Sequence, residues 1–72
     1  VEFQAAPNSP ITKKTLGEQA SFFREYGILI GGVEHEGRWE VAVGTTRVLP
    51  ESRVIAICSS RQLRNVRRLF SV

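Results

Sequence analysis

The apolar run at residues 28–33 constrains the fold of this chain more than any other segment. A continuous apolar run of this length is typical of a central strand that is buried on both faces. Gly31 and Gly32 interrupt the run, and glycines inside a strand indicate a bulge or the close approach of another backbone. The sequence therefore predicts a buried strand at 28–33, with backbone crowding at its two glycines.

A helix is predicted immediately before this strand. Thr15 and Glu18 have the spacing of a capping box, in which each side chain binds the other residue's backbone amide. Gly27 is suited to the left-handed position that ends a helix. Three apolar residues recur at helical spacing on one face between these signals. They are Leu16, Ala20 and Phe23.

Further strands are predicted on both sides of residues 28–33. Residues 1–5 alternate between apolar and polar side chains. Residues 54–58 form a second apolar run, which predicts another buried strand at 53–58. Residues 33–43 are typical of a hairpin with its turn at Glu36 and Gly37, followed by a half-buried strand. Residues 47–49 could add a short strand, and residues 11–14 are predicted to be extended or loop. The apolar positions of the half-buried strand are Trp39, Val41 and Val43.

A second helix is predicted at the C-terminal end. Ser59 and Gln62 have capping-box spacing, and Leu63, Val66 and Phe70 fall on one face of the helix that would follow. The predicted fold is α+β, a small β-α-β-β-β-α domain. It has a four- to five-stranded, mostly antiparallel sheet with two helices.

The small size of the chain favours self-association. A chain of 72 residues buries only about 60% of its unfolded surface. Cys58 has no second cysteine to pair with, and His35 is the only histidine, so neither a disulfide nor a Cys/His metal site is predicted. Association with a partner is then a common means of stabilisation. We expect one domain over 1–72, with 1–10 as first strand and linker and 11–70 as core, excised from a longer protein.

Few residues offer catalytic chemistry. The sequence contains no aspartate and no phosphate-binding loop. His35 is predicted to lie exposed at the hairpin tip between Glu34 and Glu36, without a nucleophile. Cys58 ends an apolar run, which predicts a buried, reduced thiol. We therefore predict no catalytic residues, no metal ligands and a non-enzymatic function.

The net charge of +3 arises at the C-terminal end, since residues 1–60 carry six basic and seven acidic side chains. A near-neutral body is not the pattern of a dedicated nucleic-acid-binding domain. A solvated helix face is the favoured interpretation of the basic cluster. The alternative is a module that docks nucleic acid or an anionic membrane through this helix. The cluster comprises Arg61, Arg64, Arg67 and Arg68.

The order of these features resembles the TrkA-C domain family, also called the RCK C-terminal domain. The resemblance covers about residues 1–70 and rests on the spacing of several segments rather than on one motif. The segments are residues 15–18, 23–37, 46–50, 53–57 and 62–63.

The resemblance implies a cytoplasmic regulatory domain at the membrane face, attached to a channel or transporter for cations, often potassium. Its partners would be a second copy of the domain and the attached transport protein or its nucleotide-binding domain. No cofactor is certain. The resemblance implies a small-molecule or nucleotide effector, bound at or near the dimer interface.

We expect the effector-binding site at the junction between the first helix and the following strand, together with the end of the third strand. Arg24 would meet an anionic group of the effector, and its neighbours would form an apolar pocket. Members that bind cyclic dinucleotides tend to have a basic and a polar residue where Phe23 and Leu29 stand here. The predicted ligand-binding residues are Phe23, Arg24, Leu29, Ile30, Val43 and Gly44.

Overall fold

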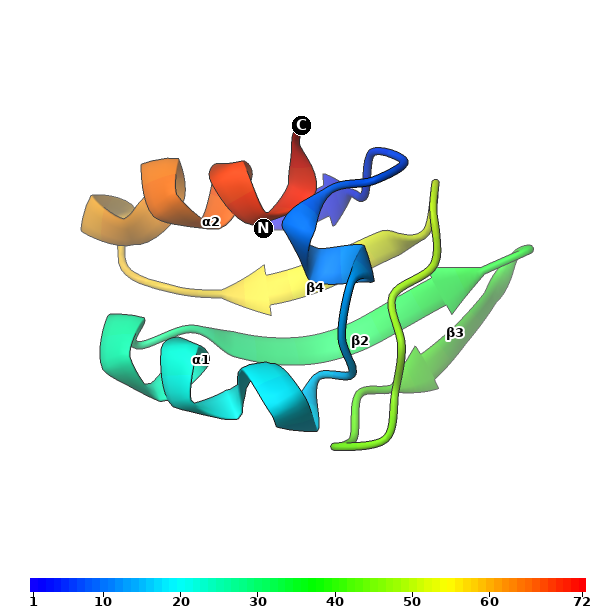
Figure 1. Cartoon of the computed structure of the whole chain (residues 1–72), viewed down its shortest axis with the longest axis horizontal. Coiled ribbons are helices and arrows are strands. Elements are labelled where there is room, and N and C mark those ends of the chain that lie inside the picture. Colours follow the sequence, from blue (N-terminus) through cyan, green and yellow to red (C-terminus); the bar gives the residue numbers. More distant parts are fainter.

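The computed structural model describes residues 1–72 as a four-stranded antiparallel sheet with two helices (Figure 1). The strand order is β1-β4-β2-β3, so the chain's first strand pairs with its last. The predicted α+β fold is confirmed, with four strands. The elements are β1 (Glu2–Gln4), η1 (Pro10–Thr12), η2 (Gly17–Gln19), α1 (Ala20–Tyr26), β2 (Leu29–His35), β3 (Arg38–Val41), β4 (Arg53–Ile57), η3 (Ser60–Gln62) and α2 (Leu63–Phe70), where η marks a 3₁₀ helix.

A single core lies between one face of the sheet and the two helices. Val54 and Ala56 of β4 point into this core and are fully buried. The rings of Phe3 in β1 and Phe70 in α2 stack in parallel, with centroids 5.0 Å apart. Phe23 of α1 belongs to the same cluster of buried side chains. Both helices therefore cover the same face of the sheet, and no element covers the other.

The prediction of strands buried on both faces was wrong. The strand β2 is central, because it pairs with both β3 and β4, but Leu29 at its start is exposed. The run at 53–58 alternates between buried and exposed residues along β4. All four residues of β3 are exposed, although we predicted a half-buried strand. Two-sided burial needs a second covering layer, and this chain supplies helices for one face only.

The two glycines of β2 produce a bulge but no crowding. The register between β2 and β4 shifts between Ile30 and Gly32, so the predicted bulge is confirmed. A Cβ atom at Gly31 or Gly32 would lie at least 3.5 Å from its nearest neighbour, which is ordinary contact, so the predicted crowding was wrong. The close backbone approach lies elsewhere, between Gly17 and Gly44, where a Cβ on Gly17 would lie 2.8 Å from the Gly44 carbonyl oxygen.

The local signals around α1 and the hairpin are confirmed. The amide of Thr15 donates to Glu18 Oε1 at 2.9 Å, and the amide of Glu18 donates to Thr15 Oγ1 at 3.2 Å, which completes the capping box. Gly27 ends the helix in the left-handed conformation, with φ 64°. Glu36 and Gly37 both have positive φ, as a tight hairpin turn requires.

Several local predictions near the other elements were wrong. Residues 47–49 form no strand, only a single bridge between Thr15 and Arg47. Residues 11 and 12 belong to the 3₁₀ turn η1 rather than to extended chain or loop, whereas residues 13 and 14 are loop, as predicted. Ser59 makes no side-chain capping bond, and the side-chain Oε1 of Gln62 accepts from Asn65 Nδ2 at 2.9 Å rather than from the Ser59 amide.

The inner face of α2 is only partly as predicted. Val66 and Phe70 are buried, whereas Leu63 is half-buried and Leu69, which we did not predict, joins the core. The thiol of Cys58 is half-buried rather than fully buried, because β4 ends one residue before it and the chain leaves the sheet there.

Candidate functional site

The six predicted ligand-binding residues lie around one hollow of about 270 Å³. The helix α1 contributes Phe23 and Arg24, and the start of β2 contributes Leu29 and Ile30. The segment after β3 contributes Val43 and Gly44. The fold therefore brings together residues that are up to 21 positions apart in the sequence, from 23 to 44. Five further residues line the hollow: Leu16, Gly17, Ala20, Ile28 and Ala42.

Leu16 and Ala20 could have been found from the helical stripe that precedes Phe23, because a stripe of this kind marks the inner face of a helix. Gly17 and Ala42 have no comparable signal in the sequence. Gly17 joins the hollow because its amide donates to the Gly44 carbonyl at 2.7 Å, and Ala42 joins it because its amide donates to the Gly31 carbonyl at 3.3 Å. Their contribution depends on tertiary contact alone.

Backbone hydrogen bonds hold the two walls of the hollow. On one side, the left-handed Gly27 reverses the chain, and the amide of Ile28 donates to the Phe23 carbonyl at 2.8 Å. On the other side, the amide of Gly17 donates to the Gly44 carbonyl at 2.7 Å. The amide of Leu16 donates to the Thr46 carbonyl at 2.9 Å. The last two bonds tie the chain at the start of η2 to the segment after β3, so the backbone fixes both walls of the hollow.

The lining of the hollow is apolar except at one point. Eight of its eleven lining residues are hydrophobic, and Arg24 is the only charged one. Phe23 and Ile28 are buried beneath it, while Leu29 and Val43 stand exposed at its rim. Arg24 is exposed and forms none of the ion pairs in the structure. The hollow can therefore accept an apolar or aromatic body that carries an anionic group toward Arg24.

The acidic side chains with perturbed pKa values lie outside the hollow. The backbone amide of Thr15, followed by its hydroxyl, lowers the pKa of Glu18. The Arg53 guanidinium, 3.1 Å from Glu34 Oε2, lowers the pKa of Glu34, and this contact in turn raises the pKa of Arg53. Both carboxylates are held by local partners. Arg24 takes part in no ion pair of the chain, which leaves its guanidinium available to an external anion.

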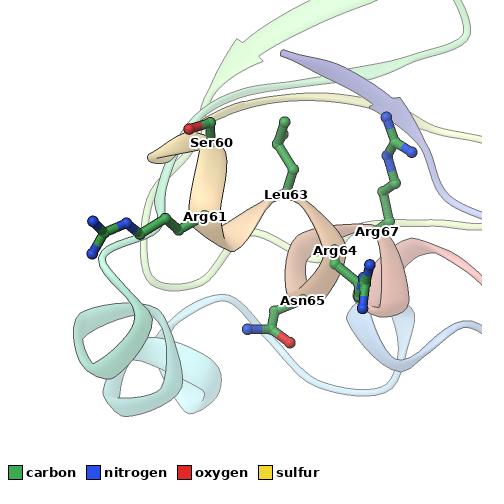
Figure 2. A pocket seen from close by; sticks show the side chains of 6 residues that line it. All are labelled: Ser60, Arg61, Leu63, Arg64, Asn65 and Arg67. Carbon is green, nitrogen blue, oxygen red and sulfur yellow. The ribbon is translucent and has the colours of Figure 1, made fainter.

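A second hollow, of about 490 Å³, lies beside the start of α2 and is lined by three of the four clustered arginines (Figure 2). Figure 2 shows the guanidinium groups of Arg61 and Arg67 at opposite ends of this hollow rather than converging on one point. Arg68 does not line it and lies instead beside Asn65 and Tyr26. All four arginines are exposed and outside every ion pair. This surface suits an extended polyanion better than a single phosphate.

The arrangement around His35 resembles a catalytic one only in its residue types. His35 Nδ1 lies 3.4 Å from Ser52 Oγ, and His35 Nε2 lies 3.8 Å from the Glu36 carboxylate. Ser52 is 1% exposed, so its hydroxyl cannot reach a substrate. The contact joins the end of β2 to the segment before β4. We assign it a structural role.

No three His, Cys, Asp or Glu side chains lie close enough together to bind a metal ion. Neither helix has the length and apolar character that a membrane span requires.

The family model described as the TrkA-C domain matches residues 1–71. No curated protein sequence matches the chain.

Two solved structures share the fold at 18% sequence identity and a TM-score of 0.81. One is the RCK_C domain dimer of S. agalactiae BusR in complex with c-di-AMP. The match covers 97% of this chain and 86% of the BusR chain in that structure. The other is S. agalactiae BusR in complex with its busAB-promotor DNA, of which this chain spans 34%.

Proposed function

The chain belongs to the TrkA-C domain family, and we propose that it is a non-catalytic, homodimeric regulatory domain that senses a small effector. The observation that carries this proposal is the hollow at the junction of α1 and β2. All six predicted ligand-binding residues line it, and its single charged group has no partner within the chain.

The effector we propose has an apolar or aromatic body and an anionic group. The apolar lining favours the body, and Arg24 favours the anion. A volume of about 270 Å³ is slightly below the range of about 300–1,000 Å³ that is usual for ligand pockets. A second protomer that covered the exposed rim at Leu29 and Val43 would enlarge and close the site. A nucleotide satisfies both chemical requirements.

We further propose that the domain acts at the cytoplasmic face of the membrane, attached to a cation channel or transporter of the potassium type. An effector that binds one dimer arrangement better than another shifts the equilibrium of the attached protein by its differential affinity. The support is the family membership. A preceding set of membrane spans or a nucleotide-binding domain in the full-length protein would support this context. A preceding DNA-binding domain would contradict it.

Effector binding can be tested with c-di-AMP as the probe, by calorimetric titration into the 72-residue chain. A hydrogen-bonded charge contributes about 1.5–3 kcal/mol. Arg24→Ala should therefore weaken binding by about tenfold to a hundredfold. Arg38→Ala removes the same charge from an exposed position on β3, outside the hollow, and should leave the affinity unchanged.

Two results would contradict the proposed site. Equal affinities of the wild type and Arg24→Ala would remove Arg24 from it. Absence of c-di-AMP binding to the wild type at about 1 mM, a concentration that detects even weak complexes, would exclude that nucleotide as the effector.

The basic face of α2 supports a second candidate function, the docking of nucleic acid or an anionic membrane. The specific observation is that four exposed arginines are spread along η3 and α2 with no acidic partner. Binding to duplex DNA or to anionic vesicles should fall steeply with added salt if this function is correct. Joint replacement of Arg64, Arg67 and Arg68 by alanine should abolish it. Binding that ignores salt and these replacements would exclude it.

A further inference from the structure

A groove between α1 and α2 is separate from the hollow that contains Arg24. It consists of two adjoining hollows, of about 520 Å³ and 270 Å³, which share Pro10, Phe22 and Leu69 in their walls. Neither has a lining residue in common with the hollow that contains Arg24. We name the two together the interhelical groove. Its principal side chains are those of Lys13, Lys14, Phe22, Tyr26, Arg68 and Leu69.

The middle of the interhelical groove is apolar. Phe22 and Tyr26 lie one turn apart on α1, with ring centroids 4.6 Å apart, and both side chains are half-buried. Leu69 lines the groove from α2, and Pro10 of η1 lines both of its hollows. No ion pair joins the two helices across it. The exposed parts of the two rings can therefore receive an apolar side chain from a partner.

Positive charges stand at both ends of the interhelical groove. Lys13 and Lys14 line only the larger hollow, and Arg68 lines only the smaller one. All three are exposed and form no ion pair within the chain. The single acidic residue of the groove, Glu18, already accepts hydrogen bonds from the amide and the hydroxyl of Thr15, at 2.9 and 3.0 Å. The groove therefore attracts negative charge at each end of an apolar middle.

The arginine end of the groove offers several hydrogen-bond donors to an anionic group. Tyr26 and Asn65 line the same hollow as Arg68. A guanidinium can bind a carboxylate through two parallel hydrogen bonds, and a tyrosine hydroxyl can add another. Asn65 Nδ2 donates one bond to Gln62 Oε1 at 2.9 Å, and its second N–H can point elsewhere. This end suits a carboxylate better than it suits an uncharged group.

We infer that the interhelical groove binds an acidic linear segment of another protein, in which an apolar or aromatic residue stands between acidic ones. The apolar residue contacts Phe22 and Tyr26, and the flanking carboxylates meet the lysines at one end and Arg68 at the other. Recognition of acidic motifs by clustered basic side chains is a recurrent mode of peptide binding. The inference goes beyond the proposed effector function, because it concerns a different site and a different class of ligand.

The charge pattern favours a peptide over a nucleic acid in this groove. A nucleic-acid strand carries a phosphate at every nucleotide, so its charge is continuous along its length. The cations of the interhelical groove are separated by apolar residues instead, and the Glu18 carboxylate at its edge would repel a phosphate. An acidic segment can place its charges at the two ends only. The groove is also distinct from the arginine-lined hollow in Figure 2, to which Arg67 contributes and Arg68 does not.

The test is a calorimetric titration of the wild-type chain with a synthetic peptide, in which one phenylalanine stands between two pairs of glutamates and both ends are blocked. We expect a dissociation constant below about 1 mM, in the range of weak peptide complexes. Arg68→Glu should raise this constant at least about tenfold, because it replaces a charge-assisted hydrogen bond by repulsion. A peptide with serine in place of phenylalanine should also bind at least about tenfold more weakly, because it loses the apolar contact.

Arg67→Glu is the matched control, because it makes the same change of charge at the neighbouring exposed position of α2, outside the groove. It should change the dissociation constant by less than about threefold, as expected for a screened charge outside the site. Circular dichroism should show that both variants keep the fold. Arg24→Ala should leave peptide binding unchanged, so the failure of the effector site and the failure of this one are distinguishable.

Several outcomes would overturn the inference. One is the absence of peptide binding to the wild type at about 1 mM. Equal losses in Arg67→Glu and Arg68→Glu would show attraction to the basic helix as a whole and not to the groove. Equal affinity for the serine peptide would show that no apolar side chain enters it. Displacement of the peptide by oligothymidylate, lost in Arg68→Glu and kept in Arg67→Glu, would assign the groove to single-stranded nucleic acid instead.

Discussion

Replacing Gly17 by alanine should destabilise the fold, although glycine to alanine is often stabilising in a helical turn. The Cβ atom of Ala at this position would lie 2.8 Å from the Gly44 carbonyl oxygen and 3.3 Å from the Gly44 Cα. All the atoms that this Cβ would meet belong to the backbone of Gly44, so the contact cannot be relieved by the movement of a flexible side chain. The segment after β3 must shift, which lengthens the 2.7 Å hydrogen bond from the Gly17 amide to the Gly44 carbonyl.

The expected loss in the free energy of unfolding is about 2 kcal/mol. Overpacking of this kind costs about 1–3 kcal/mol, and weakening one hydrogen bond adds about 1 kcal/mol. The lower entropy of the unfolded chain returns about 0.4–1 kcal/mol. For a domain of this size, about 2 kcal/mol corresponds to a fall in Tm of roughly 8–16 °C.

Urea denaturation monitored by Trp39 fluorescence measures this change directly. Gly44→Ala is the matched control, since a Cβ on Gly44 would meet nothing closer than the Gly17 Cα at 3.9 Å. It should alter stability by less than about 0.5 kcal/mol. Equal stability of Gly17→Ala and Gly44→Ala would refute the close backbone contact. Gly17→Ala should also weaken c-di-AMP binding, because Gly17 and Gly44 both line the hollow that contains Arg24.

Three further changes test other features by denaturation. Gly27→Ala should lower the free energy of unfolding by about 1–2 kcal/mol, because the φ of 64° at this position is left-handed and a Cβ there would contact no other atom. Gly27→Asn should lower it less. An alanine variant as stable as the wild type would contradict the left-handed helix end. Thr15→Ala should cost about 0.5–2 kcal/mol by removing the hydroxyl that accepts from the Glu18 amide, whereas Thr15→Ser should retain most of the stability. The Glu34 pKa lies below its ordinary value of 4.5 in the folded chain. The ionised carboxylate therefore stabilises the fold above about pH 4.5, and this stabilisation is lost as the pH falls through the folded pKa. Glu34→Gln should flatten this acid dependence of stability, and an unchanged pH profile would contradict the ion pair with Arg53.

Features that depend on neighbours in the chain could be predicted from the sequence. The capping box of Thr15 and Glu18, the left-handed Gly27 and the turn at Glu36 and Gly37 each involve residues no more than three positions apart, or one backbone conformation. Their order also carried the family resemblance, and that resemblance indicated the six residues that line one hollow. Capping spacing alone was not sufficient at Ser59, where Asn65 binds Gln62 instead.

The arrangement of layers could not be predicted in this way. The sequence shows which residues are apolar and how they are spaced, but it does not show whether a second layer of the fold covers them. The runs at 28–33 and 53–58 are typical of two-sided burial, yet both helices lie on one face and leave Leu29 and Ile57 exposed. The contact between Gly17 and Gly44 likewise joins segments 27 positions apart and leaves no local signal. Burial and close approach are properties of segments that meet in space, so the apolar run that most constrained the fold became the centre of an exposed surface only once the helices had packed.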